Sequence, residues 1–360
     1  MSRRIKLLFV LFGLLLFLLG ACTDSAYYLQ AARGQYAILE KRQPIAELLS
    51  GTTIDSQRKA ELARILQIRD FATTQLALPD NASYRSYVEL DRPYPIWNVV
   101  AAPALSLKPK TWCFPIAGCV SYRGYFSKSA AKSFAQSLQD ENYDTLVAGV
   151  PAYSTLSWFD DPVLSSFSHW PAASIARLIF HELAHQQLYL TGDSAFNEAF
   201  ATSVGIAGTR LWLSQYGSAE ERRQFAIQLE REVAFVNWTN SLRQQLADLY
   251  ASSLSDQEKL TRKNNLFAAA HLQYQALKNS WGGYGGYDNW VKTLNNARLA
   301  SLQTYRRLLP AFNRLFEENQ RNFSRYYQAC KELSKKSTEQ RRQFLASLQP
   351  TPQPTTRENP

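Results

Sequence analysis

A short segment, His181-Glu182-Leu183-Ala184-His185, combines residue types and a spacing that suit metal chemistry. Side chains four positions apart on a helix project from the same face, so both imidazoles can reach a single Zn²⁺. Glu182 lies between them, where a carboxylate can accept a proton from a water at the metal without being a ligand itself. The segment therefore predicts a metal-binding helix with a general base beside it.

A catalytic zinc usually takes three protein ligands and leaves the fourth position to water. Asn-Glu-Ala-Phe-Ala-Thr at 197–202 supplies the best third candidate, Glu198. Asn197 and Thr202 either support the ligands by hydrogen bonding or cap and pack their own helix, and the sequence does not choose between these roles. A chance match is a poor explanation because the chain has only 4 histidines.

The flanking residues predict the elements that bring these side chains together. Trp170-Pro171 suits a helix start, and apolar residues follow at helical spacing. Thr191-Gly192-Asp193 is typical of a helix end, after which Asp193 or Ser194 can cap a second helix running from about residue 195 to 213. A tight turn between the two helices would return Glu198 to the histidines.

His-Glu-Leu-Ala-His-Gln at 181–186 and the segment 197–202 resemble the zinc site of the gluzincin metallopeptidases, especially the large zinc aminopeptidases with HELAHQ and NEGFAT. The resemblance implies a zinc peptidase whose ligands are His181, His185 and Glu198. The spacer between the two motifs is shorter here, and the chain has no Gly-x-Met-Glu-Asn element, which in those enzymes holds the free amine of the substrate. Aminopeptidase specificity is therefore not carried over from them.

A longer resemblance, from about residue 25 to 320, is to a family of bacterial lipoproteins described as predicted zinc aminopeptidases. It implies an exopeptidase that acts on peptides. The residues that carry it are Arg-Pro-Tyr at 92–94, Trp-Asn-Val-Val-Ala-Ala at 97–102, Trp-Cys-Phe-Pro-Ile-Ala-Gly-Cys at 112–119, Tyr-Arg-Gly-Tyr-Phe at 122–126, Ala-Tyr-Ser-Thr-Leu at 152–156, Trp-Phe-Asp-Asp-Pro at 158–162 and Asn-Asn-Ala at 295–297.

The first residues have the pattern of an export signal. A basic start is followed by a short apolar run at 7–19, and Leu19-Gly20-Ala21-Cys22 resembles a lipobox, which predicts cleavage before Cys22 and lipid attachment to it. The alternative is a transmembrane anchor, for which the run is short. Because Thr23 rather than Asp follows Cys22, we expect the outer membrane of a bacterial envelope, with the body of the protein facing the periplasm.

The predicted periplasmic location bears on whether the remaining cysteines form disulfides. Cys113 and Cys119 can close a small loop as a disulfide in an oxidising compartment, although their spacing would also allow metal binding. Cys330 is left without a partner. The formal net charge of +10 falls to +7 once Arg3, Arg4 and Lys6 are removed (10 − 3 = 7), and such a moderately basic surface is unremarkable beside anionic lipid headgroups. An exported protein is not expected to bind nucleic acid.

The order along the chain predicts an α+β fold that is predominantly α-helical: gluzincin-like zinc-site helices, a small mixed or β region before them and a helical C-terminal part. Leu146 to Val150 is the best strand candidate, and its edge could hold an extended peptide. The expected regions are a signal peptide at 1–21, an N-terminal helical region at 22–94, a peptidase core at 95–217, a C-terminal helical region at 218–349 and a disordered tail at 350–360.

Three functions remain open at this point. The first is a zinc aminopeptidase with Glu182 as base, the second is a periplasmic zinc endopeptidase acting on envelope proteins or peptidoglycan peptides, and the third is a non-catalytic lipoprotein stapled by a metal. A peptidase also needs a donor for the oxyanion, and related enzymes use a Tyr or His downstream of the third ligand. Tyr305 is the first candidate, followed by His271, Tyr284 and Tyr287.

Overall fold

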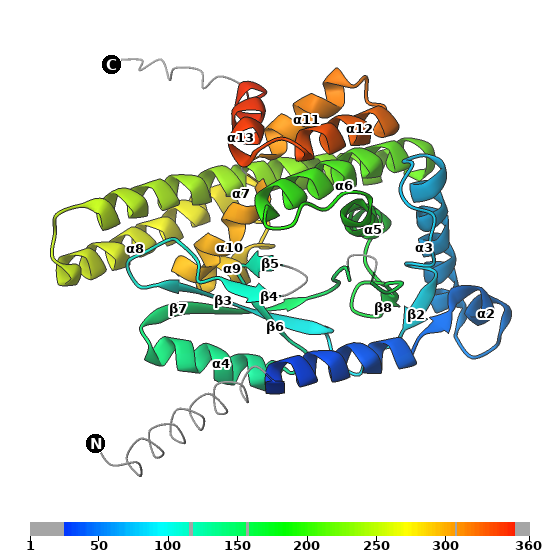
Figure 1. The fold of residues 1–360 in the computed structure, drawn as a ribbon, viewed down its shortest axis with the longest axis horizontal. Coiled ribbons are helices and arrows are strands. Elements are labelled where there is room, and N and C mark those ends of the chain that lie inside the picture. The colour runs from blue at the N-terminus through cyan, green and yellow to red at the C-terminus, as the bar shows by residue number, and fades with distance from the viewer. Residues whose placement is uncertain (1–24, 115–117, 156–157, 307, 350–360) are drawn as a thin grey trace, which may run out of the picture.

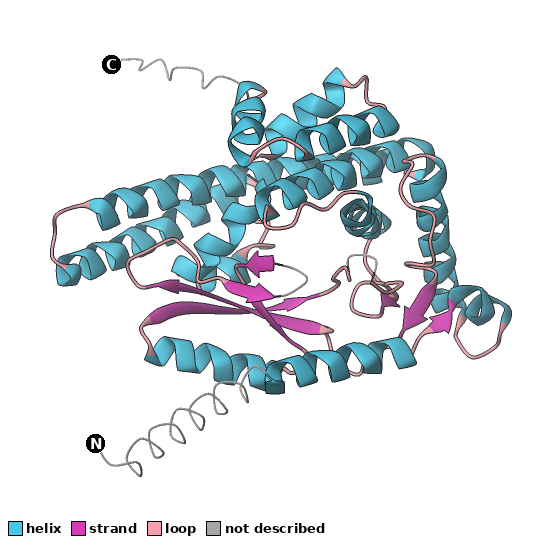
Figure 2. Cartoon of the chain, viewed as in Figure 1, coloured by secondary structure: helices cyan, strands magenta, loops and turns pink. Residues whose placement is uncertain are grey.

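Helices dominate the structure, which is a computed structural model. It describes residues 25–114, 118–155, 158–306 and 308–349; within these ranges the side chains of 303–306 are not described. Three small sheets accompany them (Figures 1 and 2), so the predicted α+β, mainly helical class is confirmed. The helices are one over residues 25–40, α2 (Ile45–Ser50), α3 (Ser56–Thr74), α4 (Lys128–Asp140), α5 (Ala172–Gln187), α6 (Ser194–Tyr216), α7 (Ala219–Ala251), α8 (Asp256–Ser280), α9 (Asp288–Lys292), α10 (Asn296–Arg306), α11 (Leu309–Glu318), α12 (Phe323–Ser334) and α13 (Thr338–Ser347).

The largest pairing is in the central sheet, whose strand order is β6-β3-β7 and whose neighbours are antiparallel. The β3–β7 register runs from Ile96 opposite Val150 to Pro103 opposite Tyr143. The strand predicted at 146–150 is confirmed and forms the second half of β7. The strands are β1 (Gln43–Pro44), β2 (Ser86–Val88), β3 (Ile96–Pro103), β4 (Trp112–Phe114), β5 (Gly118–Val120), β6 (Arg123–Tyr125), β7 (Tyr143–Val150) and β8 (Val163–Leu164).

Helices cover both faces of the central sheet. On one face Trp97, Val99 and Ala101 pack against the apolar side of α4. On the other face Val100 and Leu146 pack against Ala297 of α10. Alternate residues of a strand point to opposite faces, which explains the division of β3 between the two layers.

The main core is built around α5 and α6, which lie side by side (Figure 1). Its buried side chains extend from Ile38 to Leu345 and come from α2, α3, α5, α6 and the C-terminal helices α11 to α13. All three globular regions expected from the sequence contribute to it. The region boundaries near 94 and 217 stay predictions.

The helix ends follow the local sequence closely. Pro171 is the N-cap of α5, one position before the expected first turn, and α5 ends at Gln187 because Leu188 is already extended, at φ −152° and ψ 123°. The predicted stop at 191–193 therefore lies in the connection between the helices. Asp193 caps α6 by accepting a hydrogen bond from the backbone N–H of Phe196 at 3.2 Å.

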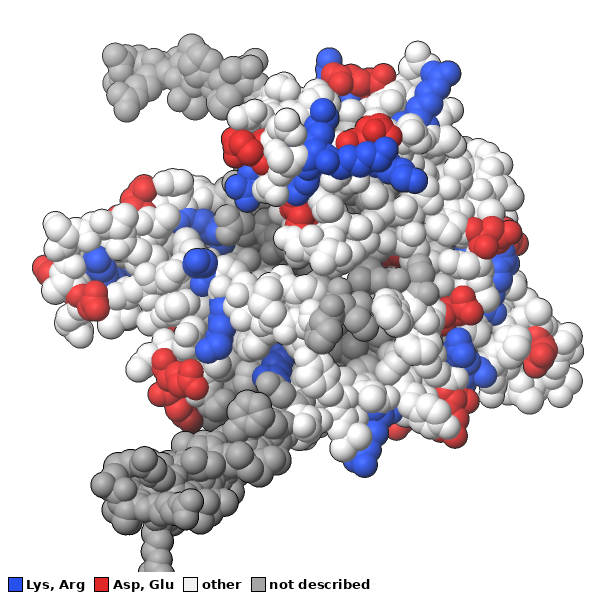
Figure 3. Space-filling view, in the orientation of Figure 1, with Lys and Arg blue, Asp and Glu red and all other residues white. Residues whose placement is uncertain are grey.

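The surface carries charged side chains of both signs. Lys and Arg alternate with Asp and Glu on the face shown in Figure 3. Within the described ranges no helix is long and apolar enough to cross a membrane. The predicted lipobox with Cys22 and the tail at 350–360 lie outside the described residues.

Candidate metal centre

The two helices of the site approach closely because α6 carries a glycine at the crossing. A Cβ added at Gly205 would lie 2.9 Å from the carbonyl oxygen of Arg177 and 3.4 Å from Cβ of His181. Gly208, one turn later, would place a Cβ 2.6 Å from Leu76 Cδ1 and 2.8 Å from Phe180 Cδ2. Gly205 therefore lets the backbone of α6 lie against the turn of α5 that begins the histidine motif.

His181, His185 and Glu198 converge on one point between α5 and α6. The Nε2 atoms of the two histidines are 3.1 Å apart. Glu198 Oε2 lies 3.4 Å from His181 Nε2, and Oε1 lies 3.7 Å from His185 Nε2. The three residues form the candidate metal-binding group among the described residues, with ligand atoms within 4.8 Å of one another.

This arrangement fits a divalent cation better than a closed set of hydrogen bonds. Two nitrogens bound to one tetrahedral Zn²⁺ at about 2.0–2.1 Å would be about 3.3 Å apart, close to the separation of the two Nε2 atoms. Glu198 Oε2 and His185 Nδ1 are buried and have no hydrogen-bond partner within the described part of the chain. Buried polar atoms without a partner are costly, and an ion at the point of convergence would satisfy Glu198.

The charge states of the ligands are set by burial and by one another. Burial, together with the charge of the neighbouring His181, lowers the pKa of His185 to about 4 against an opposing effect of Glu198, so this imidazole is in the neutral form that binds metals. Burial also lowers the pKa of His181, but its polar contact with Glu198 and the charge of Glu182 outweigh burial and the net shift is upward. Burial raises the pKa of Glu198, whereas the contacts with His181 and His185 lower it, and the net shift is downward.

Glu182 is not among the converging ligands, although it belongs to the same helix. Its side chain is buried, and burial, followed by the charges of Glu198 and Asp161, raises its pKa to about 7 against an opposing effect of His181. A carboxyl group with a pKa near neutrality can both accept and return a proton under physiological conditions. The environment therefore suits a general base.

A hydrogen-bonded network holds the end of α5 at the site. Gln186, the residue after the second histidine, accepts from Asn81 Nδ2 at 2.8 Å and donates to Ser83 Oγ at 3.2 Å and to Asp161 Oδ2 at 3.4 Å. Asp161 is 3 % exposed and also accepts from the backbone N–H of Thr155. Burial raises the pKa of Asp161 to about 6, although these hydrogen bonds oppose the shift.

Arg69 on α3 anchors the loop that carries this network. Its guanidinium is fully buried and donates to the carbonyl oxygens of Ser83, Pro79 and Asn81 at 2.8 to 2.9 Å. Tyr84 follows in the loop at φ 62°, and its buried hydroxyl has no hydrogen-bond partner among the described residues. Burial raises the pKa of Tyr84 strongly, and the charge of Glu182 is the next cause.

The β4–β5 hairpin lies against the connection between the two site helices. Cys113 and Cys119 form a disulfide between paired positions of its strands. At the start of β5, a Cβ added to Gly118 would be 3.5 Å from Thr191 Cγ2 and 3.7 Å from the backbone nitrogen of Gly192. The disulfide therefore fixes a hairpin that contacts the loop from which Glu198 is positioned.

Tyr122 follows the hairpin directly and is a candidate residue that the sequence did not single out. Its side chain is 38 % exposed, yet desolvation by the surrounding protein raises its pKa, with the charge of Glu198 as the next cause and Glu182 as a further one. Tyr189 is also close to Glu198, whose charge contributes to its raised pKa. The Tyr-Arg-Gly-Tyr-Phe segment at 122–126 carried part of the family resemblance, but spacing along the chain did not connect Tyr122 to residues beyond 180.

Other predicted residues have other surroundings. Asn197 exchanges two hydrogen bonds of 2.8 Å with the backbone of Leu190, so it fixes the loop rather than a ligand side chain. Thr202 is buried one turn after Glu198. Tyr305 lies in α10, but its side chain is outside the described residues.

The reserve candidates for the oxyanion pack elsewhere. His271 Nδ1 is 2.7 Å from the carbonyl oxygen of Phe267 in α8. Tyr287 stacks on Phe235 with ring centroids 3.9 Å apart, and Tyr284 lies beside it under the guanidinium of Arg231. These side chains belong to the packing between α7, α8 and the 281–290 segment.

Comparison with known families adds one finding. The family model described as "Putative aminopeptidase" matches residues 26–345. The chain belongs to this family. Membership implies a hydrolase that acts on peptides, and the matched region contains the whole candidate metal centre. No curated protein and no solved structure matched the chain.

Proposed function

We propose that this protein is a zinc-dependent aminopeptidase in which His181, His185 and Glu198 hold the metal and Glu182 is the general base. The observation that carries the proposal is the convergence of both Nε2 atoms and the Glu198 carboxylate on one point, with Glu182 buried on the same helix. Family membership supports peptides as substrates. When bound, Zn²⁺ supplies a Lewis acid that polarises a peptide carbonyl and acidifies water.

Glu182 moves the proton in the proposed reaction. Its carboxylate accepts a proton from the water that attacks the peptide carbonyl carbon, and the resulting carboxyl group delivers this proton to the leaving amine nitrogen as the C–N bond breaks. The raised pKa favours both transfers near neutral pH. His181 and His185 would bind the metal as neutral imidazoles and take no part in this transfer.

Tyr122 is the donor that we assign to the oxyanion formed from the peptide carbonyl. Its upward-shifted pKa keeps the phenol protonated, so the hydroxyl can donate a hydrogen bond. Its partial exposure gives it access to a bound peptide, and the disulfide-bonded hairpin before it restricts its position.

The non-catalytic alternative requires a different ligand set. A structural zinc usually has four protein ligands, whereas the candidate group among the described residues has three. Three ligands leave a position for water, as a hydrolytic site requires.

We also propose that the protein is an exported lipoprotein, attached through Cys22 and facing the periplasm. The signal-like pattern at 1–22 and the Cys113–Cys119 disulfide, which persists in oxidising compartments, support this location. Incorporation of a labelled fatty acid into the wild type but not into Cys22→Ala is the expected result. Equal labelling of both proteins would contradict lipidation at Cys22.

The deciding experiment compares wild type with Glu182→Gln on peptides with free and with blocked N-termini. We expect hydrolysis of free peptides alone, one zinc bound by both proteins and a loss of about 10²- to 10⁴-fold in kcat for the variant. Glu230→Gln, which removes an exposed carboxylate of α7, is the matched control and should be fully active. Cleavage of blocked peptides would indicate the endopeptidase, and no cleavage of either kind by the zinc-loaded wild type would contradict the enzymatic proposal.

A further inference from the structure

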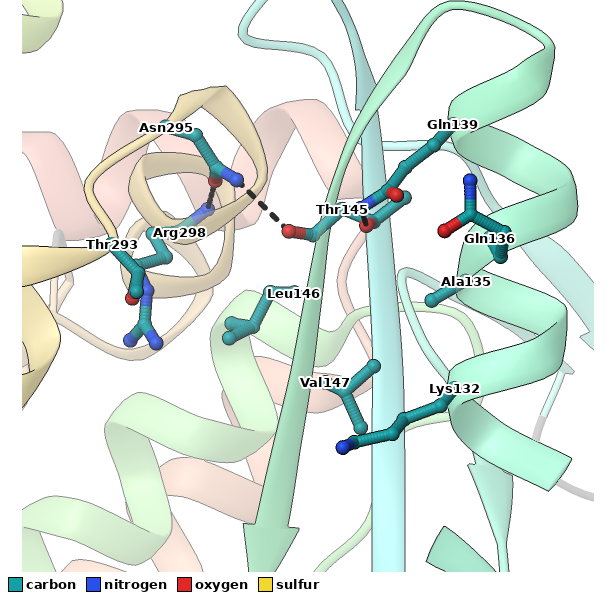
Figure 4. Close-up of a pocket in the computed structure, with 10 residues that line it drawn as sticks. All are labelled: Lys132, Ala135, Gln136, Gln139, Thr145, Leu146, Val147, Thr293, Asn295 and Arg298. Carbon is teal, nitrogen blue, oxygen red and sulfur yellow. Dashed lines mark hydrogen bonds between the residues drawn. The ribbon is translucent and has the colours of Figure 1, made fainter. Parts of the chain in front are cut away.

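A groove of about 370 Å³ runs along the outer edge of β7, between α4 and the start of α10 (Figure 4). It lies away from the metal centre, because the first half of β7 and α5 are on opposite sides of the molecule in Figure 1. Its floor is β7, one wall is α4 and the other is the 293–298 segment. The residues that line it are Lys132, Ala135, Gln136, Gln139, Thr145, Leu146, Val147, Thr293, Asn295 and Arg298.

The floor of the groove is an open strand edge. The carbonyl oxygen of Ala101 accepts a hydrogen bond from the backbone N–H of Lys110 at 2.8 Å, so the backbone polar groups of Ala101 point away from β7. The backbone N–H and C=O of its register partner Thr145 must then point away from β3, because hydrogen-bonded and non-hydrogen-bonded residue pairs alternate along an antiparallel pair of strands. The same alternation directs the backbone groups of Val147 and Gly149 to the outer edge.

Two of these three edge positions, Val147 and Gly149, are available to a ligand, whereas Thr145 already has a side-chain partner. Asn295 Nδ2 donates to the carbonyl oxygen of Thr145 at 2.9 Å, as a neighbouring strand would. The structure describes no hydrogen bond for the outward backbone groups of Val147 or Gly149, and both residues are half-buried. An added strand could pair there without displacing any described contact.

The opposite edge of the sheet shows how such groups are normally satisfied. At β6, Gln30 accepts from the backbone N–H of Phe126 at 3.1 Å and donates to the carbonyl oxygen of Gly124 at 3.5 Å. The helix at 25–40 thereby covers the β6 edge with a side-chain amide. Only the β7 edge is left open beside a groove in the described sheet.

The two walls carry one cation each. Lys132 extends from α4, and Arg298 extends from α10 on the other side of β7 (Figure 4). Neither has an ion-pair partner among the described residues, whereas Lys263 nearby is paired with Asp144 at 2.8 Å. Burial lowers the pKa of Arg298, whose guanidinium lies 5.9 Å from the ring centroid of Trp290 and has no described carboxylate beside it.

We propose that this groove binds an extended acidic peptide segment, which adds to the sheet as a fourth strand beside β7. Consecutive residues of a strand point to opposite faces, so two adjacent acidic residues would meet Lys132 on one wall and Arg298 on the other. A second copy of this chain is a poor occupant, since pairing two β7 edges would bring four cations together. The site is independent of the metal.

The test measures binding of two labelled peptides of equal composition by fluorescence polarisation. Thr-Val-Glu-Asp-Val-Thr has adjacent acids, and Thr-Glu-Val-Asp-Val-Thr has both acids on one face. The protein is the full chain in detergent with Glu182→Gln to prevent hydrolysis, with and without a chelator. We expect the first peptide to bind at least about fivefold more tightly, unaffected by the chelator, because it alone pairs with both walls.

Three variants identify the groove. Lys132→Glu and Arg298→Glu should each weaken binding about fivefold, while Lys128→Glu, an exposed position on the same helix outside the groove, should not. Val147→Pro removes the edge N–H at a position where a strand tolerates proline, and it should weaken binding about tenfold with an unchanged circular dichroism spectrum.

Several results would overturn the proposal. These are equal binding of the two peptides, wild-type affinity in Lys132→Glu and Arg298→Glu, and full binding by Val147→Pro. Loss of binding on chelation would assign the peptide to the metal centre instead. A dimer that Val147→Pro abolishes in light scattering would make a second copy the occupant.

Discussion

Gly205→Ala should lower the zinc affinity of the candidate metal centre, although Gly205 lies on α6 and has no side chain that could bind the metal. The new methyl group would lie 2.9 Å from a backbone oxygen, that of Arg177, and 3.4 Å from Cβ of His181, so α5 and α6 must separate by several tenths of an ångström. Overpacking of this kind costs about 1–3 kcal/mol, and the better helix propensity of alanine returns about 1 kcal/mol. We expect a free energy of unfolding of the zinc-free protein up to about 2 kcal/mol lower.

The matched control is Gly208→Ala, one turn later on the same helix. There the obstacles are Leu76 Cδ1 and Phe180 Cδ2, which are side-chain rather than backbone atoms. Urea unfolding gives the stability of each variant, and competition with a chromophoric chelator gives its zinc affinity. Gly205→Ala should bind zinc at least about tenfold more weakly and Gly208→Ala as the wild type does, since misplaced supporting groups cost 10- to 100-fold in affinity. Wild-type zinc affinity in Gly205→Ala would refute the claim that this crossing positions the histidines.

Three further predictions concern the surroundings of the site. The pKa of Asp161 is raised from 3.8 to about 6, so between pH 4 and 6 the folded protein holds a proton on this residue that the unfolded chain releases. The free energy of unfolding should therefore fall by about 3 kcal/mol as pH rises through this range. Urea titrations at several pH values should show this slope in the wild type and not in Asp161→Asn. A persistent slope would mean that other groups cause it. The double variant Cys113→Ser, Cys119→Ser should lower the free energy of unfolding, measured by calorimetry, by about 2 kcal/mol, as expected for a short closed loop. Unchanged stability of this variant would contradict the prediction. Tyr122→Phe should reduce kcat about 10²- to 10³-fold with little change in KM or zinc content, and an unchanged kcat would remove Tyr122 from the oxyanion role.

The sequence contained most of the metal centre because its residues are local. His181 and His185 share one helical face, and the turn before Asp193 dictates that α6 returns alongside α5. Helix-capping residues and the apolar periodicity specified both helices to within a few residues, and the strand at 146–150 was recognisable from its β-branched and apolar residues.

What could not be predicted depends on contacts between distant segments. Asp161, Ser83 and Gln186 meet only because the loop anchored by Arg69 packs against α5. Tyr122 follows a hairpin in which Gly118 lies beside Thr191 and Gly192 of the α5–α6 connection, and the charge of Glu198 contributes to its raised pKa. With 19 tyrosines in the chain, no local pattern distinguishes this one, and the choice of Tyr305 followed family resemblance rather than geometry.

X-ray absorption at the zinc edge tests the central claim most directly. The zinc-loaded wild type should contain one ion per chain with two imidazole nitrogens and further oxygen ligands, and Glu198→Ala should retain the imidazole signal at much lower affinity. Sulfur at the metal, which would point to cysteine ligands, or a wild-type zinc spectrum in a His181→Ala, His185→Ala double variant, would contradict the assignment of the site.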